Sequence, residues 1–218
     1  MAATTTRAAT VEQRIVLDNI SWEAYEHLLA EFADRRSPRL TYDRGMLEIV
    51  SPTPQHEEDH LALAAVVAVV AEELGIDFRP VGSTTYRRRE LLQGFEADSS
   101  FYITNERFAR DNAVIDPQSA PPPDLVIEAD VTHATLDKLS VYAGFGVPEV
   151  WRSRLGLVSI HRLDGHEYRE SRESAVLPPL TSGVLTRFLA ESRRQRRLAW
   201  LREVRTWARV GPSSEKAN

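Results

Sequence analysis

The sequence predicts a single mixed α/β domain. Helix-like and strand-like segments alternate along the chain, the first strands form a hairpin, and a basic helix closes the sequence. With 218 residues, 42% of them apolar, the chain can bury one substantial core. We expect residues 13–210 to form this domain, and residues 1–12 and 211–218 to be disordered ends.

Local signals define the first half of the domain. An amphipathic helix is expected over residues 21–33, and a hairpin over residues 40–50, with its turn at Asp43-Arg44-Gly45. A long helix then begins at Thr53, which can cap it ahead of Pro54 in the first turn. Gly75 is a suitable residue to end this helix.

The second half alternates strands with two helices. A polar, proline-rich loop precedes an apolar strand, and short strands follow the next helix. The strands are expected at residues 77–81, 84–88, 101–103, 125–130, 147–152, 157–163 and 166–169. The helices are expected at residues 135–144, where Thr135 is the cap, and at residues 187–210.

Composition excludes some functions and leaves others open. The chain has no cysteine, which excludes disulfides, thiolate zinc sites and a cysteine nucleophile and is consistent with the cytoplasm. The first residues contain no apolar run, so we expect no secretory signal, and the most apolar run, residues 61–71, is too short to span a membrane. A net charge of −5 disfavours nucleic acid, but arginines concentrate at residues 87–89 and 187–209, so this partner stays open.

Lys138 is unusual because the chain otherwise uses arginine. Lysine and arginine total 27 residues, and the only other lysine is Lys216 in the terminal segment. A lysine ammonium is a compact charge whose pKa responds to burial, whereas arginine is a planar, permanently charged fork. Either the chemistry at this position requires lysine, or Lys138 is an ordinary solvated residue on a helix.

Two acidic pairs accompany the strands. In the strand 125–130, Glu128 and Asp130 share one face about 6.6 Å apart, and Glu128 would be costly to bury unpaired. This pair could share a divalent cation, or it could lie on an exposed edge strand. Glu96 and Asp98 precede the strand 101–103, where acids near a glycine are also common in turns.

The segment His56-Glu57-Glu58-Asp59-His60 matches the H-E-x-x-H motif of zinc metallopeptidases. Its position argues against that function, because His56 falls in the first helical turn, where acids are favoured. The next acids on this helix cannot fold back to provide a third ligand. We therefore expect Glu57 to face the acidic strands, and a zinc peptidase is the least favoured alternative.

Several carboxylates and one lysine suit the hydrolysis of a phosphodiester by a hard divalent cation. Carboxylates hold Mg²⁺ or Mn²⁺, and an ammonium can stabilise an attacking hydroxide or the charge on the phosphorane. In such an acidic cluster, removing one carboxylate should leave the metal-free stability unchanged or higher, because like-charge repulsion is relieved.

A family resemblance rests on three segments: RLTYDRGMLEIVSPTPQHEE, GSTTYRRRELLQGFEADSSFYI and PPPDLVIEADVTHATLDKLSVYAGFGVPEVWR. They resemble the bacterial Uma-type restriction endonucleases of the PD-(D/E)XK nuclease superfamily, from about Arg39 to Phe188. The resemblance implies a restriction-endonuclease-like core, a central mixed sheet flanked by helices. It also implies that Asp98 matches the superfamily's first aspartate, Glu128 its strand glutamate and Glu57 its helix glutamate.

The chain departs from the superfamily pattern at three positions. Asp130 stands at the lysine position of the E-x-K motif, so Lys138 would be a lysine that has moved to the following helix. Ala97 stands where proline is usual, and Ser99 where an acid is common.

The expected function is that of a Mg²⁺- or Mn²⁺-dependent endonuclease acting on DNA in the cytoplasm. The expected catalytic residues are Asp98, Glu128, Lys138 and Glu57. The expected metal ligands are Asp98, Glu128, Asp130 and Glu96, with the Ala129 carbonyl as a further ligand. The main alternative is a nuclease-fold module that binds nucleic acid without efficient chemistry. The basic helix would either contact phosphates or pack, on its own domain or in a homodimer.

Overall fold

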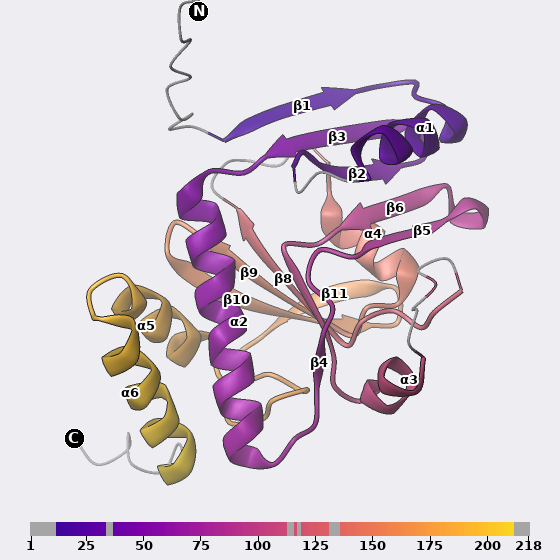
Figure 1. The fold of residues 1–218 in the computed structure, drawn as a ribbon. Coiled ribbons are helices and arrows are strands. Elements are labelled where there is room, and N and C mark those ends of the chain that lie inside the picture. Colours follow the sequence, from indigo (N-terminus) through magenta and orange to yellow (C-terminus); the bar gives the residue numbers. More distant parts are fainter. Residues whose placement is uncertain (1–11, 34–36, 113–115, 117–118, 131–135, 212–218) are drawn as a thin grey trace, which may run out of the picture.

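The computed structural model describes residues 12–33, 37–112, 116, 119–130 and 136–211. Two β-sheets and six α-helices make up this part of the chain (Figure 1). The predicted mixed α/β class is confirmed, and so is a central mixed sheet flanked by helices. None of the described helices is long and apolar enough to cross a membrane.

The central sheet has the strand order β11-β10-β9-β8-β7-β4. Its strands β8 and β9 are parallel, and its other neighbouring strands are antiparallel. The strands are β4 (Arg79–Pro80), β7 (Ser99–Tyr102), β8 (Leu125–Asp130), β9 (Glu149–Arg154), β10 (Leu157–Asp164) and β11 (Glu167–Ser171). Because β8 lies between β7 and β9, the alternative of an exposed edge strand is wrong.

The N-terminal sheet has the order β1-β3-β2-β6-β5 and carries the predicted hairpin. Helix α1 (Trp22–Phe32) covers it, and Trp22 and Tyr25 pack there against Tyr42. The strands are β1 (Gln13–Leu17), β2 (Arg39–Asp43), β3 (Met46–Ser51), β5 (Thr85–Arg88) and β6 (Gln93–Glu96), with a 3-10 turn, η1 (Arg89–Leu91), between β5 and β6.

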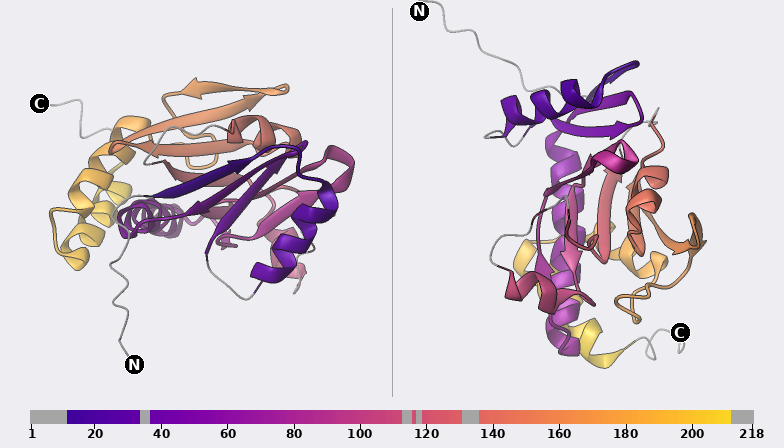
Figure 2. Two further views of the ribbon diagram at one scale, coloured as in Figure 1. Left: turned by 90° about the horizontal axis from the view of Figure 1, so that it is seen from above. Right: turned by 90° about the vertical axis from the view of Figure 1, so that its right-hand side faces the viewer.

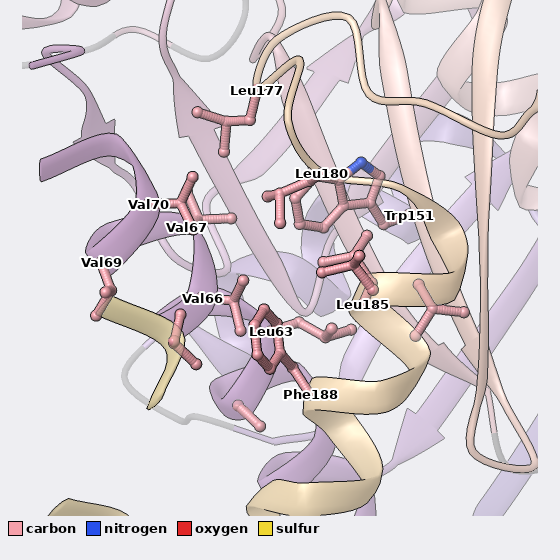
Figure 3. Packing of buried hydrophobic residues seen from close by; sticks show 14 of the residues in the cluster. Leu63, Val66, Val67, Val69, Val70, Trp151, Leu177, Leu180, Leu185 and Phe188 are labelled. Carbon is pink, nitrogen blue, oxygen red and sulfur yellow. The ribbon is translucent and has the colours of Figure 1, made fainter. Parts of the chain in front are cut away.

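Helix α2 (Pro54–Leu74) has the predicted ends. The Thr53 side chain accepts the amide of His56 at 3.3 Å, and Gly75 ends the helix in the left-handed region at φ 65°. The helix packs its valines against Trp151 of the central sheet and against the C-terminal helices (Figure 3). It therefore connects the two sheets along one side of the molecule (Figure 1).

The opposite face of the central sheet carries α4 (Lys138–Phe145), which packs Tyr142 and Phe145 onto Phe95 and Val126. Asp137 caps this helix by accepting the amide of Leu139 at 3.1 Å. The predicted cap, Thr135, lies outside the described residues. A short helix, α3 (Glu106–Asp111), lies between β7 and β8 in the sequence.

The single basic helix predicted over residues 187–210 is wrong. Two helices are present, α5 (Ser182–Ser192) and α6 (Arg197–Val210), and the chain becomes extended at Arg196 between them. The interruption lets both helices lie along α2 (Figures 1 and 2) and cover it with their apolar faces. The two helices also pack on each other through Phe188 and Trp207. The apolar faces of α5 and α6 both pack on α2, and this tertiary contact cannot be inferred from the helical periodicity of residues 187–210.

Candidate active site

The site is built where the two sheets meet. Strands β7 and β8 are antiparallel, with Ser99 opposite Ile127, so the preceding residue Asp98 lies opposite Glu128. Both carboxylates are buried, with 4% and 1% of each residue exposed. The Asp98 side chain also accepts the backbone amide of Ala129 at 2.7 Å, which joins the turn before β7 to β8.

Asp98 is surrounded by positive charge. Its Oδ1 contacts Nη1 of Arg39, and its Oδ2 lies 2.7 Å from Nε2 of His56. Burial by itself would raise the pKa of Asp98, but the hydrogen bond from His56 and the charge of Arg39 outweigh it and hold the pKa well below its usual range. Asp98 is therefore an ionised carboxylate even in its buried position.

His56 bridges two acids. Its other ring nitrogen, Nδ1, lies 2.9 Å from Oε2 of Glu12, which is itself buried. Burial opposes the charged imidazole, yet the hydrogen bonds to Asp98 and Glu12 raise the pKa of His56 to about 9. At neutral pH the ring is therefore an imidazolium that donates to a carboxylate on each side.

Glu128 is held by α4. Its Oε2 lies 2.7 Å from Nζ of Lys138, and its Oε1 accepts the hydroxyl of Tyr142 at 2.5 Å. Lys138 and Tyr142 reach the same carboxylate because residues four apart lie on one helical face. The Lys138 side chain is 12% exposed, so the alternative of a solvated helix lysine is wrong.

Glu57 reaches the acids through Arg39. Its Oε1 lies 2.7 Å from Nη2 of Arg39, and its Oε2 lies 3.0 Å from Nε2 of His60. His60 in turn contacts the hydroxyl of Ser99 at 3.0 Å. The expected orientation of Glu57 toward the acidic strands is therefore present, and Arg39 is the residue that links it to Asp98.

The other two expected metal ligands are Glu96 and Asp130. Glu96 accepts the amide of Leu40 at 3.0 Å and the hydroxyl of Thr85 at 2.6 Å, so its hydrogen bonds join β2 to β5. Burial raises the pKa of Glu96 despite these hydrogen bonds. The side chain of Asp130 lies outside the described part of the structure.

The histidines of the H-E-x-x-H segment are used as hydrogen-bonding groups. Their rings are 6.2 Å apart, and each ring nitrogen has a partner in Glu12, Asp98, Glu57 or Ser99. Across the described ranges, no three His, Cys, Asp or Glu residues are arranged to hold a metal ion. The geometry therefore gives no support to a structural or peptidase-type zinc site.

The donor chemistry at Asp98 and Glu128 nevertheless fits Mg²⁺ or Mn²⁺. Magnesium is commonly bound through one or two carboxylates, while waters and substrate phosphates complete its coordination. Asp98 and Glu128 are two such carboxylates on facing residues, and the Ala129 carbonyl belongs to the same strand as Glu128. An open pocket of about 510 Å³ reaches Asp98 and is also lined by Arg39, Glu57, His60 and Ser99.

Sequence reasoning missed four residues of this site: Glu12, Arg39, His56 and Tyr142. His56 is recognisable only as part of a zinc motif, and the position of Tyr142 one helical turn after Lys138 indicates packing rather than a role in the site. Tyr142 does pack in the core, and its hydroxyl also donates to Glu128. Nothing in the sequence distinguishes Arg39 from the other arginines, or shows that Glu12 belongs to the folded protein.

Comparison with known proteins agrees with the resemblance seen in the sequence. A search of curated proteins gave no match. Among solved structures, the chain is similar to one described as a "putative nuclease belonging to DUF820 from Anabaena variabilis ATCC 29413". The identity is 18% and the TM-score 0.49, over 74% of this chain and 98% of the other. The family model Uma2, described as "Putative restriction endonuclease", matches residues 22–191, and the chain therefore belongs to the Uma2 family.

Proposed function

We propose that this protein is a divalent-metal-dependent endonuclease that hydrolyses phosphodiester bonds in DNA. The observation that carries the proposal is the pair of buried carboxylates Asp98 and Glu128 on facing residues, with the Lys138 ammonium 2.7 Å from Glu128. Membership of a restriction-endonuclease family supports the same class of reaction. We take the predicted residues 13–210, together with Glu12, as the nuclease unit, and the cytoplasm as its location.

In this proposal Asp98, Glu128 and the Ala129 carbonyl hold the cation. Bound Mg²⁺ or Mn²⁺ would supply a Lewis acid for the phosphoryl oxygen and a more acidic water. The chain's own contribution is to fix the donors: His56 and the Ala129 amide orient Asp98, and Tyr142 orients Glu128. Such outer contacts set the direction in which a carboxylate presents its lone pairs.

Lys138 is the proposed catalytic cation. Its Nζ is anchored on Oε2 of Glu128, so a proton on Nζ can be directed at an attacking water or at a non-bridging phosphate oxygen. Glu57 contributes by holding Arg39 at the pocket wall. The pocket beside Asp98 is the proposed entry for the scissile phosphate.

The test is cleavage of supercoiled plasmid by purified protein with Mg²⁺, with Mn²⁺ and with EDTA. We expect cleavage with either cation and none in EDTA, and loss of cleavage in Asp98→Asn and Glu128→Gln. Asp164→Asn is the matched control, because Asp164 pairs with Arg169 on an exposed part of the surface. Cleavage by both site variants at the wild-type rate would refute the proposed site.

A second candidate is a nuclease fold that binds DNA without cutting it. One observation favours it: each oxygen of Asp98 and Glu128 already contacts a protein donor. DNA binding by gel shift, without cleavage under any divalent cation, would select this candidate over the endonuclease.

A further inference from the structure

Arg39, the first residue of β2, holds two acids at once. Its Nη1 contacts Oδ1 of Asp98, and its Nη2 lies 2.7 Å from Oε1 of Glu57. The side chain is 9% exposed and lines two pockets, the pocket at Asp98 and a groove of about 490 Å³ beside α1 and β5. The guanidinium therefore stands between the proposed metal ligand and the space from which a substrate would enter.

The lone pairs of Asp98 determine which of its two oxygens could coordinate a metal ion. A carboxylate oxygen has two lone pairs. Oδ2 accepts from Nε2 of His56 and from the amide of Ala129, both at 2.7 Å, which uses both of its lone pairs. Coordination capacity on Asp98 is therefore at Oδ1, and that is the atom that Arg39 contacts.

Charge reinforces this conflict. A divalent cation bound to Oδ1 would lie about 2–2.6 Å from that oxygen, close to the positively charged Arg39 guanidinium. Arg39 occupies one of the two lone pairs of Oδ1, and a cation bound to the other would lie so close to the guanidinium that the two positive charges would repel each other strongly inside a buried site. Either the metal stays out or Nη1 of Arg39 moves away from Asp98.

Nη2, at the other end of the guanidinium, is held by Glu57 and could stay in place while Nη1 moves away from Asp98. Glu57 is held on its far oxygen by His60 at 3.0 Å, and His60 is held by Ser99 at 3.0 Å. Nη2 can therefore stay on Glu57 while Nη1 turns into the pocket. The ligand suited to an arginine fork at a pocket wall is a phosphate, which in this protein would be a phosphate of the DNA.

We propose that Arg39 and the divalent cation compete for Oδ1 of Asp98, and that a DNA phosphate draws Arg39 away so that metal and substrate bind together. The inference rests on the proposed function, because it requires a metal at Asp98. It makes Arg39 a positioning residue that occupies Oδ1 of Asp98 in the metal-free site. Metal affinity should then be low without DNA and higher with it.

The test is Mn²⁺ binding measured by calorimetry without nucleic acid, in the wild type and in Arg39→Met. Removing the competitor should tighten Mn²⁺ binding by about tenfold or more, within the usual range of coupling between ligands. Arg89→Met is the matched control, because Arg89 also bridges two glutamates, Glu23 at 2.9 Å and Glu26 at 3.1 Å. Its Mn²⁺ affinity should equal that of the wild type.

A second arm adds a short DNA duplex that carries non-hydrolysable phosphorothioate linkages. The duplex should tighten Mn²⁺ binding in the wild type and have a smaller effect in Arg39→Met, where the competitor is already gone. If Arg39→Met does not fold, Arg39→Lys replaces it, since one ammonium lacks the two separate Nη groups that contact Asp98 and Glu57 and should give an intermediate affinity.

The outcomes separate the inference from the function on which it rests. Equal or weaker Mn²⁺ binding in the Arg39 variants, with clear binding in the wild type, would overturn the competition and leave the metal-dependent nuclease intact. Absence of Mn²⁺ binding in every variant, with and without the duplex, would overturn both. Tighter binding in Arg39→Met and unchanged binding in Arg89→Met would support the inference.

Discussion

Replacing Asp98 with alanine should destabilise the metal-free protein. If Asp98 belonged to a cluster of mutually repelling acids, its removal would instead leave stability unchanged or raise it, because like-charge repulsion would be relieved. In the structure, however, Asp98 is the shared acceptor of the Arg39 guanidinium, the His56 imidazolium and the Ala129 amide. Alanine would leave two buried cations facing each other, with Nη1 of Arg39 only 3.3 Å from Nε2 of His56.

The size of the effect follows from the burial of this cluster. Removing one partner of a buried ion pair typically costs about 3–5 kcal/mol, because the remaining charge keeps its desolvation penalty. Asp98 is 4% exposed, so solvent offers little compensation. With a urea m-value of about 1–3 kcal/mol/M, the midpoint of unfolding should fall by roughly 1–5 M.

The assay is urea unfolding in EDTA, followed by circular dichroism and by tryptophan fluorescence to check that one transition is observed. Asp98→Asn should be intermediate, because the amide keeps an acceptor but loses the charge. Asp164→Ala removes an acid from the exposed Asp164–Arg169 pair and should cost less than about 1 kcal/mol. An Asp98→Ala protein at least as stable as the wild type would refute the reasoning and restore the picture of mutually repelling acids.

Three further predictions concern other residues. Lys138→Arg should lose roughly 10²-fold in single-turnover cleavage, much as Lys138→Ala does, because a planar fork cannot replace a compact charge; a near wild-type rate would contradict this. The pKa of His56 is raised from 6.5 to about 9 in the folded state. Its contribution to the free energy of unfolding should therefore be fully present below about pH 6.5 and lost as pH rises through 9. Urea midpoints in EDTA should show this decline in the wild type and a smaller one in His56→Gln. Arg193→Ala should lower stability without changing the salt dependence of DNA binding, because Arg193 binds Asp59 at 2.6 Å.

The parts of the fold that sequence predicted are those with local signals. Thr53, Pro54 and Gly75 specify the two ends of α2 by capping and backbone chemistry that operate within a few residues. The hairpin of β2 and β3 is likewise defined by its turn at Arg44 and Gly45, both of which have positive φ. Such elements are predictable because their determinants are adjacent in the chain.

The parts that were missed depend on distant neighbours. Strand β6 contains Gly94, which resembles a turn residue in the sequence, yet the glycine is required because the ring of Tyr25 from α1 packs directly on it. The interruption between α5 and α6 depends on two apolar faces meeting α2. Neither contact leaves a periodic or compositional signal, because the partner is far away in the sequence.

The residues of the candidate site also divide into those that have a signal in the sequence and those that do not. Glu128 and Lys138 could be named from the sequence because an acid inside a strand is costly to bury and lysine is rare in this chain, whereas Asp98 could be named only from the family resemblance. Their assembly depends on the pairing of β7 with β8 and on the first turn of α4, which the structure provides. The residues that balance their charge could not be named, because an arginine in an arginine-rich chain and a histidine in a zinc-like motif carry no distinguishing mark.

The two cations of the site show why one is arginine and the other lysine. Arg39 contacts Asp98 through Nη1 and Glu57 through Nη2, so the two ends of one planar fork hold two carboxylates. Lys138 meets a single oxygen of Glu128, whose other oxygen is held by Tyr142, so a compact ammonium suits that position. The fork can release one acid and keep the other, which suits a residue that yields its place to a metal. The ammonium is a compact charge held next to Glu128, which suits a residue that acts on the phosphodiester.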